Sequence, residues 1–204
     1  MTGSGGFEEA VAALEAGLVV VLPTDTVYGL VVDPRRPGAT GRLFAIKERP
    51  TDAALPVLAA DEATAFALAE HVPDTAVRLA AAHWPGPLTL VVPRAPGLAL
   101  DLGGADDRTI GVRVPDHELV RALARRVGPL AATSANLHGR PTPATADEVI
   151  AQLGGADVAL VIDGGPCRGA PSTVVACTGG EVTVLREGRL PASTVTATIH
   201  APRG

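Results

Sequence analysis

Short runs of β-branched and other aliphatic residues recur along this 204-residue chain, separated by segments rich in alanine and leucine at helical spacing. The runs cover residues 18–22, 55–59, 88–92, 109–114, 158–162, 172–176 and 181–185. Strands that alternate with helices in this way pack as layers, with the helices lying on a sheet. The sequence therefore predicts an α/β fold.

Capping residues indicate where several of the helices begin. Two short helices are expected within residues 61–82, with Asp61 and Asp74 as their N-caps. Another helix should cover residues 116–127, with Asp116 as its N-cap. Because these helices fall between the apolar runs, we expect them to flank the sheet.

The composition argues against a protein that works mainly by binding nucleic acid. The formal net charge is -5 and the isoelectric point is near 5.5, so the chain as a whole repels phosphate. Aromatic residues make up only 2% of the chain, whereas single-strand binders stack bases on aromatic side chains. Any contact with nucleic acid would need a local basic patch.

The sequence contains no recognisable metal site or disulfide framework. Cys167 and Cys177 form no CxxC motif, and the histidines lack the spacing of a metal cluster; they are His71, His83, His117, His138 and His200. The first residues lack a basic segment followed by an apolar stretch, and no run approaches about 18 apolar residues. We therefore expect a cytoplasmic protein with no resident metal and no membrane segment.

Polar side chains directly follow the apolar run of residues 18–22. Thr24, Thr26 and Tyr28 lie in the segment Pro23-Thr-Asp-Thr-Val-Tyr-Gly-Leu30. In α/β sheets ligands bind in the crevice where strands end, so these side chains are candidates for binding. Pro, Asp and Gly also favour turns, and an ordinary turn after a strand is the alternative.

A second candidate group ends the helix that we expect from Gly38 to Ile46. Lys47 and Arg49 flank Glu48, and Pro50 prevents the helix from continuing. A lysine and an arginine together can neutralise a phosphate and a carboxylate. The alternative is that both cations only complement the helix dipole.

Thr133, Ser134 and Asn136 follow the apolar residues 129–132 at the end of another expected strand. If the segment stays extended, Ser134 and Asn136 point to the same face and present a hydroxyl and an amide. These groups could bind phosphate oxygens or a purine edge. Capping of a turn is the alternative.

Two further segments could contact an anion. The glycine-rich stretch of residues 163–173 ends in the hydroxyls of Ser172 and Thr173, but it is neither a Walker A loop nor a dinucleotide motif. Along residues 109–115, Thr109 and Arg113 alternate with apolar residues, so one strand face presents the arginine. The alternatives are that residues 163–173 form an ordinary surface loop and that Arg113 is solvated.

Taken in order, these motifs closely resemble the YrdC/Sua5 family. The matching segments are Pro23-Thr-Asp-Thr-Val-Tyr-Gly-Leu30, Lys47-x-Arg49-Pro50, Pro85-Gly-Pro-Leu-Thr89, Gly111-Val-Arg-Val-Pro115, Thr133-Ser-Ala-Asn136 and Ser172-Thr-Val-Val175. The resemblance runs from about residue 11 to residue 189. It implies a twisted, open mixed sheet with flanking helices around a large basic cleft.

The resemblance also implies an activity, that of L-threonylcarbamoyladenylate synthase. Such an enzyme condenses L-threonine, bicarbonate or CO₂, and ATP into threonylcarbamoyl-AMP and pyrophosphate, with Mg²⁺ accompanying ATP. The product serves the t6A modification of adenosine-37 in tRNA. The implied partners include double-stranded RNA or tRNA and, transiently, the tRNA threonylcarbamoyl transferase complex.

Roles for individual residues follow from the resemblance alone. Lys47, Arg49, Ser134 and Asn136 match the family signature and are the expected catalytic residues. The residues expected to bind ATP are these four together with Thr133, Ser172 and Arg186. The residues expected to bind threonine are Thr24, Thr26, Tyr28, Arg49, Thr109 and Arg113.

The chain resembles the short form of the family. We expect a catalytic domain over residues 1–190 and a short tail over residues 191–204 that is poorly ordered. Many relatives carry an aspartate after Val175, where this chain has Ala176-Cys177, so no role is assigned to such an acid. Two alternatives remain open: a double-stranded RNA-binding module of the same fold, and a family paralogue without synthase activity.

Overall fold

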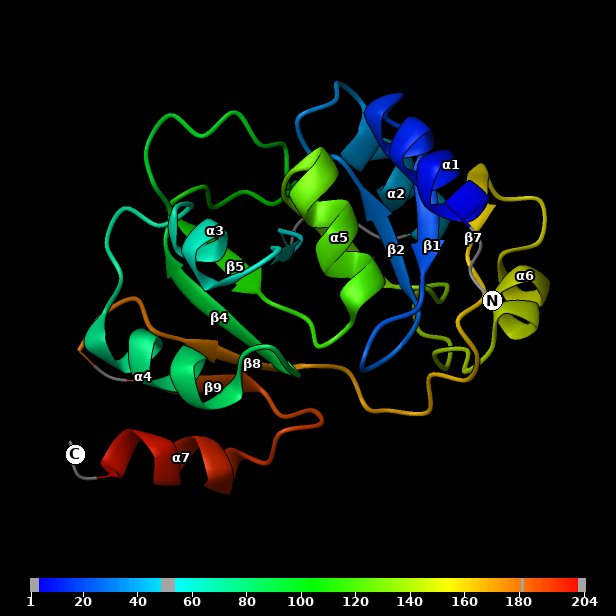
Figure 1. Ribbon diagram of the computed structural model, residues 1–204. Helices are drawn as coiled ribbons and strands as arrows, with labels where there is room; N and C mark the ends of the chain where they lie inside the picture. Colours follow the sequence, from blue (N-terminus) through cyan, green and yellow to red (C-terminus); the bar gives the residue numbers. More distant parts are fainter. Residues whose placement is uncertain (1–3, 49–53, 181, 202–204) are drawn as a thin grey trace.

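The computed structural model describes residues 4–48, 54–180 and 182–201 (Figure 1). Nine strands of these residues form one mixed sheet in the order β7-β1-β2-β6-β3-β5-β4-β8-β9. The strands are β1 (Val19–Leu22), β2 (Gly29–Val32), β3 (Val57–Leu58), β4 (Leu88–Pro93), β5 (Thr109–Arg113), β6 (Leu130–Ser134), β7 (Val158–Val161), β8 (Thr173–Ala176) and β9 (Thr183–Arg186). The α/β fold with a twisted, open mixed sheet is confirmed.

Helices flank this sheet on both sides (Figure 1). They are α1 (Ser4–Glu15), α2 (Ala39–Lys47), α3 (Glu62–Phe66), α4 (Asp74–His83), α5 (Glu118–Val127), α6 (Ala146–Leu153) and α7 (Ala192–His200). Parallel pairing joins β1 to β7, β3 to β5 and β4 to β8, whereas the other neighbouring strands are antiparallel. Helix α2, between β2 and β3, and helix α5, between β5 and β6, contribute to two different apolar clusters.

In the half of the sheet that contains β7, β1, β2 and β6, helices cover both faces. Val20 and Val31 belong to an apolar cluster with residues of α1 and α5. Val21 and Leu30 belong to a second cluster, on the opposite face, with residues of α2 and α6. Because neighbouring residues of a strand point to opposite faces, a strand covered on both sides needs an unbroken apolar run.

In the other half, helices cover one face only. Leu90 on β4 and Val112 on β5 pack in a cluster with residues of α4, and α7 lies against α4. The residues between them in the alternation, such as Thr89 and Gly111, face the other side of the sheet. Figure 1 shows this half turned strongly relative to β1 and β2, as the twist of a large sheet requires.

Several expectations about local structure were wrong. His117 and not Asp116 is the N-cap of α5, and its side chain makes no capping hydrogen bond. Asp74 is already the first residue of α4, after Pro73 in extended conformation, so it does not cap that helix. Asp61 does cap α3, where its side chain accepts a hydrogen bond from the backbone N–H of Thr64.

The C-terminal segment is also more ordered than expected. Residues from Ala192 to His200 form α7 instead of a poorly ordered tail. The physical reason is the packing of this helix, because Val195 is buried and His83 of α4 is hydrogen-bonded to Thr198 at 2.9 Å. None of the helices in the described part of the chain is long and apolar enough to cross a membrane.

Candidate active site

A cleft with a volume of about 530 Å³ opens on the uncovered face of the second half of the sheet. Its walls come from the loop between β1 and β2, the end of β6, and strands β3, β4, β5 and β8. Ten residues predicted from the sequence line it: Thr24, Thr26, Lys47, Thr109, Arg113, Thr133, Ser134, Asn136, Ser172 and Arg186. Segments far apart in the sequence thus meet in one cavity large enough for a small-molecule substrate.

Two predicted residues are not placed in the cleft. Arg49 lies outside the described residues. Tyr28 is fully buried and its hydroxyl donates a hydrogen bond to the carbonyl of Gly165 at 2.8 Å. Because Gly29 lines the cleft and side chains alternate along a strand, the side chain of Tyr28 points to the opposite side, so the structure does not bring it to the other threonine-binding candidates.

Lys47 lies at one end of the cleft, where α2 delivers it to the end of β6. Lys47 is only 3% exposed. Nζ donates hydrogen bonds to the carbonyl of Ser134 at 2.6 Å and to Oδ1 of Asn136 at 3.1 Å. Ser134 donates its hydroxyl to the same Asn136 oxygen. A cation, a hydroxyl and an amide therefore converge at one point, as the sequence predicted for Ser134 and Asn136.

Asn136 itself is held in place by the loop that follows β6. Its Nδ2 donates to the carbonyls of Leu137 at 2.9 Å and Arg140 at 2.8 Å. These contacts require the amide nitrogen to face the loop, so the amide oxygen faces Lys47. The backbone carbonyls of this loop thus preorganise the cluster.

On the opposite wall, hydroxyls gather around Ser172. Its Oγ lies 2.9 Å from Oγ1 of Thr89 on β4. Arg186 on β9 donates two hydrogen bonds to the carbonyl of Ser172, from Nη2 at 2.8 Å and from Nε at 3.2 Å. A second cation therefore lies beside the hydroxyl pair.

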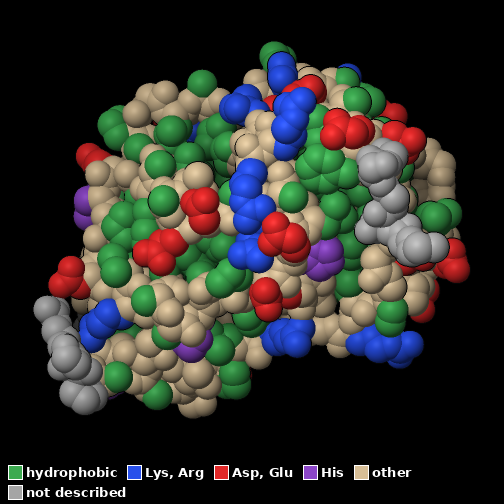
Figure 2. Space-filling view, viewed as in Figure 1, with side chains coloured by type: hydrophobic (Ala, Val, Ile, Leu, Met, Phe, Trp, Pro, Cys, Tyr) green, Lys and Arg blue, Asp and Glu red, His purple; other side chains and the backbone are tan. Residues whose placement is uncertain are grey.

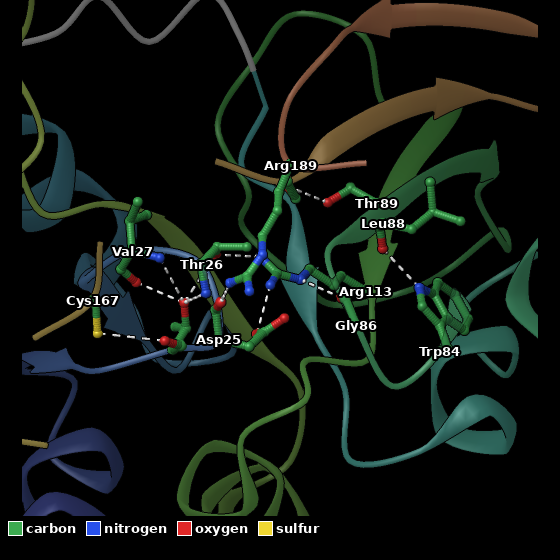
Figure 3. Close-up of polar contacts among 12 residues, drawn as sticks. Asp25, Thr26, Val27, Trp84, Gly86, Leu88, Thr89, Arg113, Cys167 and Arg189 are labelled. Atoms are coloured by element: carbon green, nitrogen blue, oxygen red, sulfur yellow. Dashed lines mark hydrogen bonds and ion pairs between the residues drawn. The ribbon is translucent and has the colours of Figure 1, made fainter. Parts of the chain in front are cut away.

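The third group is the loop between β1 and β2, which holds Thr24, Asp25 and Thr26. Arg113 reaches it from β5 (Figure 3). Its Nη2 donates to Oδ1 of Asp25 at 2.7 Å, Nη1 donates to Oγ1 of Thr26 at 3.1 Å, and Nε donates to the carbonyl of Gly86 at 3.0 Å. Arg113 is only 6% exposed.

Burial lowers the pKa of Arg113 below its ordinary value, and the carboxylate of Asp25 partly offsets this effect. A guanidinium starts from so high a pKa that it stays protonated. The Arg113–Asp25 pair is therefore a charged pair in a nearly dry wall of the cleft, and each member depends on the other for compensation.

The sequence and the fold of this chain match those of known proteins. The Sua5/YciO/YrdC family profile, described as telomere recombination, matches residues 12–188. The chain belongs to this family. A relative from Mycobacterium tuberculosis (strain H37Rv) is 43% identical over 192 residues, covering 94% of this chain and 87% of the relative.

A relative from Bacillus subtilis (strain 168), named threonylcarbamoyl-AMP synthase, is 37% identical over 201 residues. The match covers 96% of this chain and 58% of that protein. The crystal structure of P. abyssi Sua5 complexed with L-threonine superposes with a TM-score of 0.88 at 35% identity, over 95% of this chain and 57% of that one. The chain thus spans little more than half the length of these two proteins.

The cleft differs in charge from the chain as a whole. Lys47, Arg113 and Arg186 line it, and no Asp or Glu is among the described residues that do so. Outside the cleft, basic side chains run over α5 with acidic side chains beside them (Figure 2), and Arg125 is paired with Glu118 at 2.7 Å. Basic side chains thus line the cavity of a chain whose formal net charge is -5.

Several residues that line the cleft were not predicted from the sequence. His138 lines it, although the histidines carried no recognisable pattern. Thr89, Val91 and Gly111 line it as well. The alternation of side chains along β4 and β5 could have indicated that these three residues share the face of Thr109 and Arg113. Among the described residues no group of three or more His, Cys, Asp and Glu side chains could hold a metal ion.

Proposed function

We propose that this chain is a threonylcarbamoyl-AMP synthase that acts in the cytoplasm. The amine of L-threonine adds to CO₂ supplied by bicarbonate and loses a proton, giving a carbamate. A carbamate oxygen then attacks the α-phosphorus of ATP, and the bond to the β-phosphate oxygen breaks to release pyrophosphate. The nucleophile comes from the substrate, so the protein needs no activated side chain.

The convergence of Lys47, Ser134 and Asn136 carries this proposal, in a cleft that no Asp or Glu of the described part of the chain lines. Phosphoryl and nucleotidyl transfer depend on positioning and on stabilising charge that spreads over the phosphate oxygens. A buried ammonium with a hydroxyl and an amide can bind an α-phosphate and stabilise that charge. The name of the Bacillus subtilis relative and the L-threonine bound to P. abyssi Sua5 give further support.

The roles of the remaining residues follow from their places along the cleft. Ser172 and Arg186 would bind the nucleotide phosphates from the opposite wall, and Thr133 would assist Ser134. Thr109 and the loop with Thr26 would face L-threonine. Mg²⁺ would enter as part of the substrate with ATP, since the cleft offers hydroxyl and amide oxygens and the phosphates supply the anionic ligands that Mg²⁺ prefers.

A place in tRNA modification follows from this product. A mixed anhydride of a carbamate and a phosphate is an activated acyl donor, so a separate transferase would pass the threonylcarbamoyl group to adenosine-37 of tRNA. We expect that transferase complex to be a transient partner.

The test is pyrophosphate release from ATP with L-threonine and bicarbonate, with each substrate left out in turn and the adenylate detected by mass spectrometry. We expect release that requires all three substrates. Protein that binds ATP or L-threonine in calorimetry without turnover would instead be a paralogue. Protein that binds neither, yet binds double-stranded RNA, would be the RNA-binding module.

Lys47→Met and the matched variant Arg42→Met separate the site from the fold. Both residues lie on α2, but Arg42 is exposed and lies outside the cleft. Lys47→Met should reduce pyrophosphate release by about 100-fold or more, because one preorganised donor is lost. Arg42→Met should stay close to the unmodified protein. Equal losses in both variants would contradict the assignment of Lys47.

A further inference from the structure

A second cavity lies at the base of the loop between β4 and β5, which Figure 1 shows projecting beyond these strands. Its volume is about 380 Å³, enough for a small molecule. The charged residues that line it are Glu70, Arg94, Asp107 and Arg108. No described residue lines both this distal cavity and the cleft. A ligand of the distal cavity would therefore be additional to the substrates of the proposed reaction.

Backbone hydrogen bonds hold three segments of the chain side by side around the distal cavity. Ala69 forms an antiparallel bridge with Arg94. The backbone N–H of Glu70 donates to the carbonyl of Pro93 at 3.0 Å. The backbone N–H of Arg94 donates to the carbonyl of Arg108 at 2.8 Å. The backbone positions that carry Glu70, Arg94 and Arg108 are therefore fixed relative to one another.

The guanidinium of Arg94 is oriented by the loop itself. Its Nη2 donates to the carbonyls of Leu98 at 3.0 Å and Leu100 at 2.7 Å. The described part of the chain makes no use of the N–H groups of Nε and Nη1. Farther along the loop, the backbone N–H of Asp101 donates to the carbonyl of Pro34 at 2.9 Å. Arg94 is therefore a preorganised donor for an anionic oxygen.

The two acids of the distal cavity leave Arg94 unneutralised. Neither Glu70 nor Asp107 forms an ion pair with it, although all three are described residues that line the same cavity. Arg108 is paired at 3.0 Å with Asp106, which is not among the lining residues. Opposite charges that face one cavity without contacting each other are complementary to a ligand that carries both charges.

We propose that the distal cavity binds a free α-amino acid as a zwitterion. The carboxylate of the ligand accepts hydrogen bonds from Arg94, and its ammonium group donates to Glu70, with Asp107 as a second acceptor. A ligand with negative charge alone would be repelled by the two acids, and one with positive charge alone would be repelled by the arginines. The inference is independent of the proposed function, because the distal cavity is separate from the cleft.

NMR of the whole chain labelled with ¹⁵N tests this proposal. The probes are the common L-amino acids, added in small groups up to millimolar concentrations. At least one of them should shift the backbone amide signals of Ala95 and Gly97, which line the distal cavity. The signal of Asn136 reports separately on the cleft. A complete panel in which no amino acid shifts the signals of Ala95 and Gly97 would overturn the proposal.

Derivatives of the amino acid that binds show whether both of its charges are needed. The carboxamide derivative lacks the carboxylate, and the N-acetyl derivative lacks the ammonium group. Each should bind about tenfold more weakly or worse, because each loses charge-assisted hydrogen bonds. An N-acetyl derivative that binds as tightly as its parent would show a simple anion site and overturn the proposal. A carboxamide that does so would show a cation site, with the same consequence.

Glu70→Gln removes the expected partner of the ammonium group. Glu70 is exposed, and its carboxylate has no hydrogen bond or ion pair to a described residue, so the fold should be unaffected. The Kd of the amino acid should rise about tenfold or more. Glu62→Gln is the matched control, because Glu62 is an exposed acid of α3 that does not line the distal cavity. An unchanged Kd in Glu70→Gln, or equal rises in both variants, would overturn the proposal.

Arg94→Gln and Arg108→Gln test which arginine binds the carboxylate. Arg94→Gln should raise the Kd more, because Arg108 is 86% exposed and already paired with Asp106. Melting temperatures are measured alongside, since Arg94 also holds the loop through Leu98 and Leu100. If Arg94→Gln does not fold, the derivatives and Glu70→Gln decide the proposal. A larger rise in Arg108→Gln than in a folded Arg94→Gln would overturn the assignment of Arg94.

Discussion

The two halves of the sheet differ in how many of their faces are covered by helices. In β1 and β2 every residue is buried, because α1 and α5 cover one face while α2 and α6 cover the other. In β5, Ile110 and Val112 are buried under helices, whereas Thr109 and Gly111 face the cleft. One half of the sheet supplies stability on both faces, and the other half uses one face for the site.

This difference shows why the site lies where it does. Helix α5 extends over β3 but leaves the same face of β4, β5 and β8 open. The polar residues of those strands would be costly under a helix, because each buried hydroxyl or guanidinium needs a partner. In the cleft they contact one another, as Thr89 and Ser172 do. The covering helices therefore determine the position of the active site as much as its own residues do.

Truncations on the two halves should have the largest effects on stability. Leu22→Ala and Leu30→Ala, on opposite faces of the doubly covered half, should each reduce the free energy of unfolding by about 2–5 kcal/mol, since both residues are fully buried. Leu90→Ala, under α4, should cost as much. Val91→Ala, its neighbour on the cleft face, should cost less than about 1 kcal/mol.

Denaturant unfolding measures these differences, with the slope checked for constancy. A Val91→Ala variant as unstable as Leu90→Ala would mean that the cleft face is packed like a core. A mild effect of Leu22→Ala or Leu30→Ala would mean that one of the faces of the first half is poorly covered. Either result would remove the contrast between the halves.

The same contrast decides how much of the fold can be predicted. The unbroken run of residues 18–22 and the alternation at residues 109–114 both indicate strands in the sequence. Strand β2 was missed because Gly29–Val32 directly follows a turn segment. Helix α1 was missed because glycines stand in its first turn and that turn contains no acidic residue. The C-terminal helix depends on packing against α4, a tertiary contact that local signals do not contain.

The sequence predicted many of the residues that line the cleft, but not the contacts that these residues make with one another. The motifs brought together Lys47, Ser134 and Asn136 correctly. They could not predict that Arg113 pairs with Asp25, because this contact joins segments that are far apart in the sequence. The motifs also could not predict that the Tyr28 hydroxyl contacts the loop at residues 163–165, which is again far away in the sequence.

A smaller effect should be a dependence of stability on pH. One histidine in each half of the molecule should cause it. His83 ends α4, on the covered face of the second half, and His117 precedes α5, which covers the first. Burial lowers the pKa of both. Below the unfolded-state pKa of about 6.5 the unfolded chain therefore binds more protons than the folded one, and stability is lost as the pH falls.

Unfolding at pH 7.5 and at pH 5.5 tests this expectation in the unmodified protein, His83→Gln and His117→Gln. Each variant should lose less stability between the two pH values than the unmodified protein does. Identical losses in all three proteins would show that carboxylates and not these histidines dominate acid destabilisation.

The smallest expected effect is a shift of the His117 pKa itself. Asp25 raises this pKa, although burial outweighs it, whereas the pKa of His83 is lowered by burial. Asp25→Asn should therefore lower the pKa of His117 further and leave that of His83 unchanged, as followed by NMR titration of the imidazole protons. A shift in both histidines would indicate that the substitution disturbs the whole sheet, and no shift in either would place His117 too far from the Arg113–Asp25 pair to sense it. A shift confined to His117 would mean that the charge of Asp25 acts locally, at the edge of the cleft where α5 begins.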